Sequence, residues 1–174
     1  MNYILTTLTD IDLINLTKIF HELEKINIPT VFTKTIPKKY HATRTGTFTQ
    51  KDARQCSFGV TTYRGKKIES KMSKKYPHIM PLFKDFIDTH KDGFKFNSVY
   101  VNRNTVCKKH LDSKNIGESL LVGLGNYTGG ETVLYGNNEE KHFNISSYSL
   151  IFNGAKIEHS SEEFNGKRYS LVFF

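Results

Sequence analysis

Hydrophobic residues recur at a helical spacing in two stretches of the chain. In residues 10–26 the apolar positions are Ile11, Ile14, Leu16, Ile19, Phe20, Leu23 and Ile26, and Asp10 stands where an N-cap is expected. In residues 78–90, directly after Pro77, they are Ile79, Leu82, Phe83, Phe86 and Ile87. Both stretches are predicted to be amphipathic helices that support a larger structure.

The region between these helices is mostly polar. Residues 33–55 are rich in Thr and Lys and only weakly periodic, which predicts a long surface loop with an edge strand at residues 46–49. Residues 56–63 read CSFGVTTY and predict a strand, and a basic turn follows at residues 64–67. Long loops in compact domains often carry function.

After Gly93 the pattern changes to short segments rich in Val, Ile, Leu, Phe and Tyr. They are FKFNSVYVN, SLLVGLG, ETVLYG, KHFNI, YSLIFNG and RYSLVFF, with Asn137-Asn138 and Gly129-Gly130 among the turns. The two glycines suit a tight turn with positive φ. We therefore predict one domain of mainly β (α+β) class, in which residues 1–93 support a jelly-roll core at residues 94–174, a cupin-like double-stranded β-helix.

Composition narrows the classes of protein. No run approaches the roughly 20 apolar residues of a membrane span, and no secretion signal opens the sequence, so we expect an intracellular protein, cytoplasmic or nuclear. Cys56 and Cys107 are expected to be reduced, buried thiols. The net charge of +8, from 25 basic and 17 acidic residues, favours a polyanionic partner such as nucleic acid without requiring one. The oligomeric state stays open.

The clearest candidate chemistry is a metal site. His110 and Asp112 are expected directly after a strand, and in such an extended segment they project to the same side because they are two residues apart. His159 closes a strand-like run, FNGAKIEH, which a jelly roll can bring beside that pair. Two His and one carboxylate form the facial triad that holds Fe(II) and leaves positions open. A His-x-Asp alone is also typical of a surface histidine beside a turn aspartate.

Arg168 and Ser170 strengthen the metal hypothesis. They follow His159 on a predicted strand, where alternation places the guanidinium and the hydroxyl on one face. A bidentate arginine with a serine hydrogen bond suits the distal carboxylate of 2-oxoglutarate. The alternative for Arg168 is a surface arginine on an edge strand.

Further candidates surround this pattern. Tyr100 and Asn102 share a strand face that leads towards His110, where they could reach a co-substrate or equally serve as a core tyrosine and a turn asparagine. Lys108 and Lys109 flank the metal motif and could steer a phosphate backbone or form a solvated pair. Substrate candidates of lower weight are Arg44, Lys51 and Arg54 in the long loop, and Asn115. His41 and His142 have no carboxylate at a helpful spacing and are expected at the surface.

Together these motifs carry a family resemblance. The runs VNRNTVCKKHLDSKNIGESLLVGLGNYTGGETVLYG and FNGAKIEHSSEEFNGKRYSLVFF resemble the catalytic core of Fe(II)/2-oxoglutarate-dependent oxygenases, over about residues 97–174. Within that superfamily the chain most resembles the TET/JBP-like branch, whose members oxidise the methyl group of 5-methylpyrimidines in nucleic acid. The matched motifs are Asn-x-Asn, His-x-Asp, Asn-x-Gly-x-Ser, Gly-x-Tyr-x-Gly-Gly, the Asn-Gly before His159, and Gly-x-Arg-x-Ser.

The resemblance implies a reaction and its cofactors. Such enzymes hydroxylate a substrate C–H bond while 2-oxoglutarate is decarboxylated to succinate, using Fe(II) and O2, with ascorbate as a possible reductant. It implies metal ligation by His110, Asp112 and His159, and co-substrate binding by Arg168 with Ser170, Asn102 and Tyr100 nearby. A base in a duplex would have to be flipped into the pocket.

Alternatives stay open at the level of substrate and class. The segment GGET before an apolar strand also resembles prolyl 4-hydroxylase domains, although those usually carry lysine where this chain has Arg168. AlkB-type demethylases share the His-x-Asp and distal His, and the cysteine-rich region of animal TET enzymes is lacking. A peptidyl prolyl or lysyl hydroxylase is therefore the alternative enzyme, and a non-catalytic jelly-roll binding module the alternative of another class.

Overall fold

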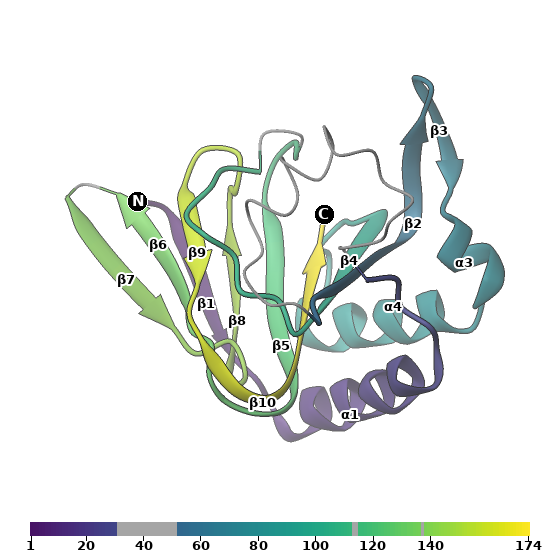
Figure 1. Cartoon of the computed structure of the whole chain (residues 1–174), viewed down its shortest axis with the longest axis horizontal. Helices are drawn as coiled ribbons and strands as arrows, with labels where there is room; N and C mark the ends of the chain where they lie inside the picture. The colour runs from purple at the N-terminus through teal and green to yellow at the C-terminus, as the bar shows by residue number, and fades with distance from the viewer. Residues whose placement is uncertain (31–51, 113–114, 137) are drawn as a thin grey trace.

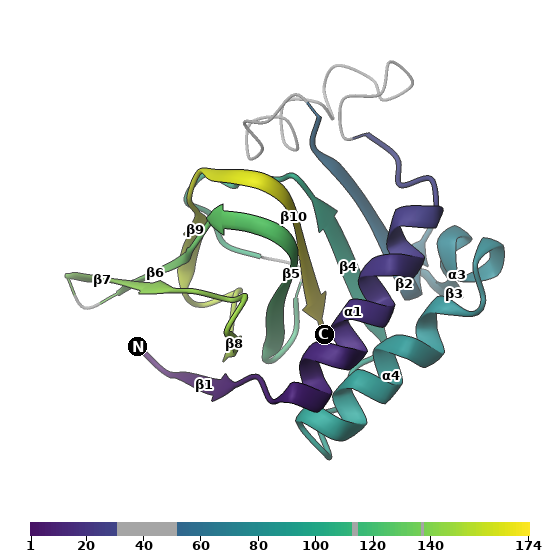
Figure 2. The same ribbon diagram turned by 90° about the horizontal axis from the view of Figure 1, so that it is seen from below.

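Two antiparallel β-sheets and a pair of packed helices make up the computed structural model (Figures 1 and 2). The structure describes residues 1–30, 52–112, 115–136 and 138–174. Three sequence predictions lie outside the described residues: the strand at residues 46–49, the substrate candidates Arg44 and Lys51, and the surface position of His41. No helix in the described part of the chain is long and apolar enough to cross a membrane.

In the described ranges the larger sheet has seven strands, in the order β1-β8-β5-β10-β4-β2-β3. Their bounds are β1 Tyr3–Thr7, β8 Tyr148–Phe152, β5 Ser119–Gly129, β10 Phe164–Phe173, β4 Ser98–Arg103, β2 Arg54–Tyr63 and β3 Lys66–Glu69. The smaller sheet has the order β7-β6-β9, with β7 Glu139–Phe143, β6 Thr132–Gly136 and β9 Glu158–Ser161. This arrangement confirms the predicted jelly-roll class.

The larger sheet extends beyond the core expected at residues 94–174. β1 pairs with β8 and β2 pairs with β4, so strands from the first 93 residues complete it on both sides. The strand predicted at residues 56–63 is β2, whereas the short β1 was not predicted. Its five residues, YILTT, are too few to show a clear period, and its partner lies far away in the sequence.

Helix α1 (Asp10–Lys25) begins with a capping box whose N-cap lies one residue before the predicted Asp10. Thr9 is the N-cap: its hydroxyl accepts a hydrogen bond from the Asp12 N–H, and the Asp12 carboxylate accepts one from the Thr9 N–H. Predicting Asp10 as the cap was therefore wrong. The buried face consists of Asp12, Leu16, Ile19 and Leu23, while Ile11 and Ile14 of the predicted stripe are 60% and 55% exposed.

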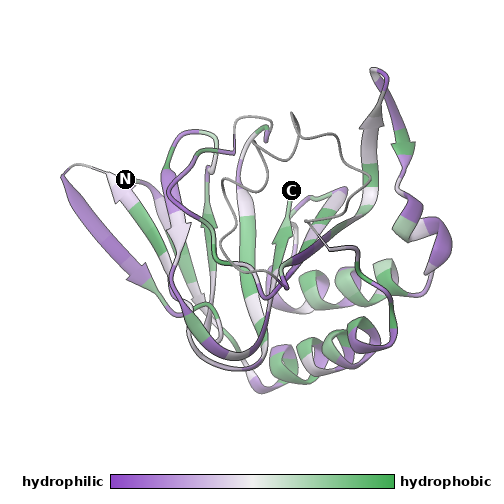
Figure 3. Ribbon diagram, viewed as in Figure 1, coloured by the Kyte–Doolittle hydropathy of each residue, from purple (hydrophilic) through white to green (hydrophobic). Residues whose placement is uncertain are grey.

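Helix α4 (Ile79–His90) matches its prediction closely. Its buried residues are Ile79, Phe83, Phe86 and Ile87, which join the core with side chains of α1, β2, β4, β5 and β10. Figure 3 shows the hydrophobic residues of α1, α4 and the larger sheet in this region. Each fully buried side chain of this size contributes about 1.5–3 kcal/mol, so the two helices anchor the sheet from its outer side. A further short helix, α3 (Lys71–Lys75), was not predicted.

A buried polar chain links the two long helices to the larger sheet. His90 of α4 lies 2.8 Å from the Asp12 carboxylate of α1 through Nδ1, and 2.6 Å from the Ser149 hydroxyl of β8 through Nε2. The order of groups is that of a hydrolase triad, but Asp12 is 1% and Ser149 0% exposed, so no substrate could reach it. Its role is therefore to fix the helices on the sheet.

The charge of Asp12 is coupled to folding. Burial alone raises its pKa, but hydrogen bonds from the Thr9 N–H, from His90 and from the Thr9 hydroxyl outweigh burial and lower the pKa overall. A lowered folded-state pKa means that the ionised carboxylate stabilises the fold above its unfolded pKa of about 3.9. That contribution is lost as the pH falls below this value through the lower folded pKa.

Replacing Asp12 should therefore lower stability in a pH-dependent way. We expect Asp12→Asn to reduce the free energy of unfolding at neutral pH by about 2 kcal/mol, since hydrogen bonds to a charged group and an N-terminal cap are both weakened. The difference from wild type should shrink as the pH is lowered below about 4. Urea unfolding across this range measures it. The exposed neighbour Asp10, changed to Asn, is the control; an equal loss there would contradict the assignment.

Candidate metal centre and adjoining cavity

A cavity of about 230 Å³ lies between the two sheets. Its walls come from β2, β4, β5, β6, β8, β9 and β10 and from the irregular segment between β4 and β5. The polar side chains that line it, besides the metal candidates, are Gln55, Tyr100, Asn102, Thr105, Cys107, Ser119, Thr132, Ser160, Ser161, Arg168 and Ser170. Leu121, Phe152 and Val172 add apolar side chains to the lining.

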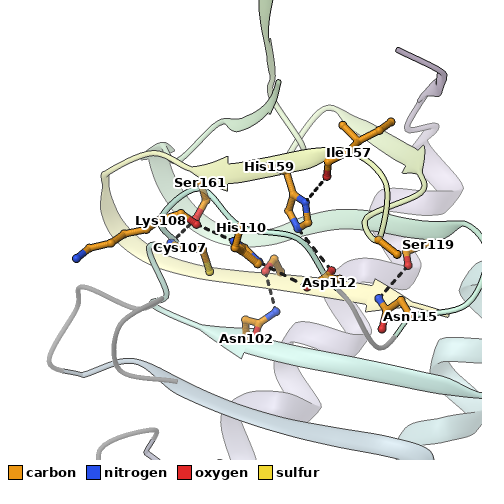
Figure 4. Close-up of polar contacts among 12 residues, drawn as sticks. Asn102, Cys107, Lys108, His110, Asp112, Asn115, Ser119, Ile157, His159 and Ser161 are labelled. Atoms are coloured by element: carbon orange, nitrogen blue, oxygen red, sulfur yellow. Dashed lines mark hydrogen bonds and ion pairs between the residues drawn. The ribbon is translucent and has the colours of Figure 1, made fainter. Parts of the chain in front are cut away.

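His110, Asp112 and His159 converge at one side of this cavity (Figure 4). His110 Nε2 lies 3.5 Å from Asp112 Oδ1, and His159 Nε2 lies 3.5 Å from Asp112 Oδ2. One ligand atom from each of the three side chains falls within 4.8 Å of the others. His159 is 9% exposed, and the other two are half-buried. Two imidazoles and one carboxylate in this arrangement form the donor set of non-haem iron sites.

Backbone pairing holds the two histidines together. The His110 N–H donates to the His159 carbonyl at 3.0 Å, and the His159 N–H donates to the His110 carbonyl at 3.0 Å. Nearby, the Ser161 N–H donates to the Cys107 carbonyl, so two residues, Lys108 and Lys109, lie opposite Ser160 alone. This is the arrangement of a β-bulge, which turns the strand and re-aims the histidine.

These contacts correct the expected positions of the ligands along the chain. His110 was expected directly after a strand, but β4 ends at Arg103 and His110 lies in the irregular segment that follows. His159 was expected at the end of a strand-like run, but it is the second residue of β9. Residues 153–157 form the turn that separates β9 from β8, which the sequence pattern merged into one run.

Hydrogen bonds on the far side of each imidazole select the ring form that suits a metal. His110 Nδ1 lies 2.6 Å from the Lys108 carbonyl, and His159 Nδ1 lies 3.0 Å from the Ile157 carbonyl. A carbonyl can only accept, so each Nδ1 carries the proton. The lone pair of each neutral ring is then on Nε2, the atom that faces Asp112.

The electrostatics of the three groups are coupled. Burial, the largest influence on Asp112, raises its pKa, but hydrogen bonds and charge from His110 and His159 hold the pKa well below its usual range. Burial lowers the pKa of His110, but its contacts with Asp112 and the Lys108 carbonyl raise it overall. The carboxylate is therefore ionised at neutral pH and available as an anionic ligand.

Gly154 explains the Asn-Gly that precedes the distal histidine. A Cβ at this position would lie 3.0 Å from Asp112 Oδ2 and 3.3 Å from His159 Cε1. The Gly154 carbonyl also accepts a hydrogen bond from the Asp112 N–H at 2.9 Å. The backbone of the turn thus packs directly against the candidate ligands, and any Cβ at this position would crowd them.

Arg168 lines the same cavity as a buried cation. Its side chain is almost fully enclosed, with 2% of the residue exposed, and its Nε has no hydrogen-bond partner. Nη1 donates to the Thr105 carbonyl at 3.4 Å, and no carboxylate among the described residues pairs with it. Burial lowers its pKa. A buried guanidinium without an anion is costly, so the site is suited to an anionic ligand.

Residues of two sequence motifs, Asn-x-Asn and Gly-x-Tyr-x-Gly-Gly, surround Arg168. Asn104, with φ of 52°, accepts a hydrogen bond from the Arg168 N–H and donates its own N–H to the Arg168 carbonyl. Tyr127 places its ring 5.6 Å from the guanidinium carbon. A Cβ on Gly130, whose φ is 68°, would lie 2.7 Å from Arg168 Nε. The expected tight turn is therefore present at Gly129 and Gly130, and it also makes room for Arg168.

Asn102 and Ser170 connect the strands beside Arg168. The Asn102 amide donates to the Ser170 hydroxyl at 3.3 Å, and its carbonyl oxygen accepts from the Gln55 amide at 2.7 Å. All three line the cavity, as does Tyr100, which is 38% exposed. Gln55 was not among the sequence candidates, because nothing in the sequence indicates that β2 pairs with β4.

The substrate candidates of lower weight do not gather at the cavity. Arg54 donates to the Ile28 carbonyl at 2.7 Å, and the Asn115 amide lies 3.4 Å from the Ser119 hydroxyl. Lys109 pairs with Glu158 at 3.1 Å and lies over the Tyr135 ring. Lys108 is exposed, and its carbonyl orients His110. None of these four lines the cavity as described.

Three other sequence expectations can be compared with the structure. Cys56 and Cys107 are free thiols, as predicted, and burial raises their pKa to about 12 and about 11. Cys107 lines the cavity, which was not anticipated. His142 was expected to lack carboxylate neighbours, yet its Nδ1 lies 3.1 Å from Glu162 and 3.5 Å from Glu131. Glu131 directly precedes β6 and Glu162 directly follows β9, so the spacing of these residues from His142 in the sequence did not reveal the contacts.

Comparisons with known proteins place the fold. No family model and no curated protein sequence matches the chain. Among solved structures, it is similar to a 2OG-Fe(II) oxygenase family oxidoreductase from Burkholderia pseudomallei, with TM-score 0.57, 18% identity, and coverage of 91% of this chain and 76% of that one. It is also similar to a Pseudomonas putida prolyl-4-hydroxylase, with TM-score 0.56, 12% identity, and coverage of 98% and 91%.

A third similar structure contains nucleic acid. It is NgTET1 in complex with 5mC DNA, with TM-score 0.53, 17% identity, and coverage of 84% of this chain and 68% of that one. The three similarities show that the chain has the fold of the 2-oxoglutarate/Fe(II) oxygenases.

The geometry of the three ligands predicts one divalent metal ion per chain. Calorimetry with Mn(II), a surrogate for Fe(II), should give one site, and His110→Ala or Asp112→Ala should weaken binding by on the order of tenfold or more. Gly154→Ala should weaken it in the same direction, because a Cβ crowds Asp112. His21→Ala, at an exposed histidine on α1, is the control. Unchanged affinity in the His110 and Asp112 variants would contradict the site.

Proposed function

We propose that the chain is an Fe(II)- and 2-oxoglutarate-dependent oxygenase that hydroxylates a C–H bond of its substrate. The observation that carries this proposal is the pairing of two features in one cavity. A His, Asp and His donor set lines it, and so does Arg168, which is buried and has no carboxylate partner among the described residues. A non-catalytic binding module would have no use for both.

His110, Asp112 and His159 would hold Fe(II), leaving coordination positions for a bidentate 2-oxo acid and for O2. When bound, the metal and co-substrate supply oxidative decarboxylation of 2-oxoglutarate to succinate, coupled to hydroxylation of the substrate, with ascorbate as a reductant that can maintain Fe(II).

The chain's own residues would bind and orient the co-substrate. Arg168 would neutralise its distal carboxylate, and the Ser170 hydroxyl, held by Asn102, would add a hydrogen bond. Asn104, directly after β4, holds the Arg168 backbone in place. Leu121 and Val172 line the cavity with apolar surface, which excludes water around the bound carboxylate and strengthens its pairing with Arg168.

For the substrate we propose the methyl group of a 5-methylpyrimidine in nucleic acid. The motif pattern over residues 97–174, the net charge of +8 and the fold similarity to NgTET1 bound to 5mC DNA support this choice. A base in a duplex would have to leave the stack to enter the cavity. Tyr100, which is partly exposed and lines the cavity, is suited to stack on such a base.

A peptidyl prolyl or lysyl hydroxylase is the second candidate. The fold similarity to the Pseudomonas putida prolyl-4-hydroxylase favours it, and it uses the same metal and co-substrate residues. The two candidates therefore differ only in what approaches the open side of the cavity.

The role of Arg168 can be tested by co-substrate affinity. We expect Arg168→Ala to raise the apparent 2-oxoglutarate constant by on the order of tenfold or more, because the loss of a charge-assisted pair costs about 1.5–3 kcal/mol. Arg168→Lys should lie in between, since it keeps the charge but not the planar fork. Lys167→Ala is the control. It removes the charge of the preceding residue, which pairs with Glu24. If the apparent 2-oxoglutarate constant of Arg168→Ala equals that of wild type, another residue binds the distal carboxylate.

Substrate class can be decided by turnover. Protein loaded with Fe(II) and 2-oxoglutarate is supplied with methylated DNA, methylated RNA, free 5-methylpyrimidine nucleosides or proline- and lysine-containing peptides, and succinate is measured with each. We expect succinate above the uncoupled background with a methylated nucleic acid, and a hydroxymethyl product by mass spectrometry. Product on peptide alone would replace the nucleic-acid proposal with the second candidate. If no succinate forms with any of these substrates, and none forms in the uncoupled reaction without substrate, the oxygenase proposal is contradicted.

A further inference from the structure

One stretch of the described structure is strongly basic. Residues 54–76 contain seven basic side chains and one acidic side chain, a net charge of +6. This stretch forms β2, β3 and α3, at one end of the larger sheet (Figure 1). The charge is therefore a local feature of the surface and not an even consequence of composition.

Five lysines form what we call the basic hairpin surface: Lys66, Lys67, Lys71, Lys74 and Lys75. All five are exposed, and the hydrophilic colouring of α3 in Figure 3 marks part of this surface. None of the five pairs with a carboxylate among the residues that the structure describes.

Other lysines of the chain do have acidic partners. Lys25 lies 2.6 Å from Glu22, and Lys84 lies 2.5 Å from Asp88. The lysines of the basic hairpin surface have no such acidic partner among the described residues. Lys75 contacts an aromatic ring instead: its Nζ lies 5.2 Å from the ring centre of Tyr76. The surface therefore presents unneutralised charge to the solvent, which attracts anionic polymers.

Protection of a sheet edge does not account for this surface. β3 is the outermost strand next to β2, and lysines on such an edge prevent unwanted strand pairing. That role can explain Lys66 and Lys67. It does not extend to Lys71, Lys74 and Lys75, because these lie on α3, which has no free strand edge.

The surface is also connected to the cavity. β2 begins beside it, where Gln55 bonds to Asn102, and runs outward to the hairpin turn at Arg64 and Gly65. The eight residue steps from Gln55 to Tyr63 span roughly 26 Å in a strand. That length equals about seven or eight nucleotides along one strand of B-DNA.

We propose that the basic hairpin surface binds the sugar-phosphate backbone of the nucleic acid whose target base enters the cavity. This inference rests on the proposed function and adds the place where the polymer is held. Phosphates about seven or eight nucleotides from the target base contact the lysines, and the strand β2 sets that separation. The surface supplies affinity and position, while sequence or base selectivity belongs to the cavity.

Binding of a labelled oligonucleotide tests the proposal directly. The probe is a fluorescein-labelled DNA duplex of about 20 base pairs with one central 5-methylcytosine, followed by anisotropy at about 50 mM salt and above. Replacing all five lysines with Gln should weaken binding by on the order of tenfold or more. The slope of log affinity against log salt should become shallower by about 0.9 for each phosphate that a lysine no longer neutralises. Lys66→Gln with Lys67→Gln, and Lys71→Gln with Lys74→Gln and Lys75→Gln, should each give part of the effect.

The matched control removes the same charge elsewhere. Lys18, Lys25, Lys84, Lys95 and Lys156 are exposed and lie away from β2, β3 and α3, and changing all five to Gln should leave the affinity within about twofold of wild type. Equal losses in the two sets would show a general charge effect and overturn the proposal. Undetectable binding by wild type would also overturn it.

Failure of this proposal can be told apart from failure of the proposed function. The oligonucleotide assay needs neither metal nor 2-oxoglutarate, whereas the oxygenase activity is measured as succinate formation. Succinate formation with intact DNA binding in the five-lysine variant would reject the surface and keep the oxygenase. If the five-lysine variant loses DNA binding but the wild-type protein forms no succinate, the proposed DNA-binding surface is supported and the oxygenase proposal is rejected.

Discussion

The paired backbone hydrogen bonds between His110 and His159 are the constraint on which the candidate site depends. They attach an irregular segment, which has no strand of its own, to β9 of the smaller sheet. The bond from the Asp112 N–H to the Gly154 carbonyl adds a third fixed point two residues later. Because backbone atoms make these bonds, the three side chains are left to face one another and the cavity. The metal candidates therefore belong to the junction of two sheets and to neither sheet alone.

Local rules predicted those parts of the site whose geometry is set within a few residues. Alternation along an extended segment was enough to place His110 with Asp112, and Arg168 with Ser170. It could not find Gln55, because that residue reaches the cavity only through pairing of β2 with β4, which are far apart in the sequence. Nor could it assign Asn104, which follows β4 and whose side chain accepts a hydrogen bond from the Arg168 N–H of β10.

The same distinction separates the correct and incorrect parts of the fold prediction. Helix α4 was predicted well because its apolar face is complete within its own sequence. In α1 the stripe was partly wrong, because the buried face includes Asp12, a polar residue that His90 of another helix makes acceptable inside the protein. A search for hydrophobic periodicity assigns such a polar residue to the exposed face, although it is buried. The β1 strand was missed for a similar reason, since its pairing with β8 is what defines it.

The order of strands in the larger sheet has a consequence for how the protein folds. β10 follows every other strand in the chain, yet it lies between β5 and β4 near the middle of the sheet. The sheet therefore cannot be assembled progressively from one edge during synthesis, and its central ladders close only after distant segments have met. Native contacts of such high sequence separation make folding slow, on the order of milliseconds to seconds for domains dominated by them. The strand that carries Arg168 would thus complete the cavity and the hydrophobic core in a single late event.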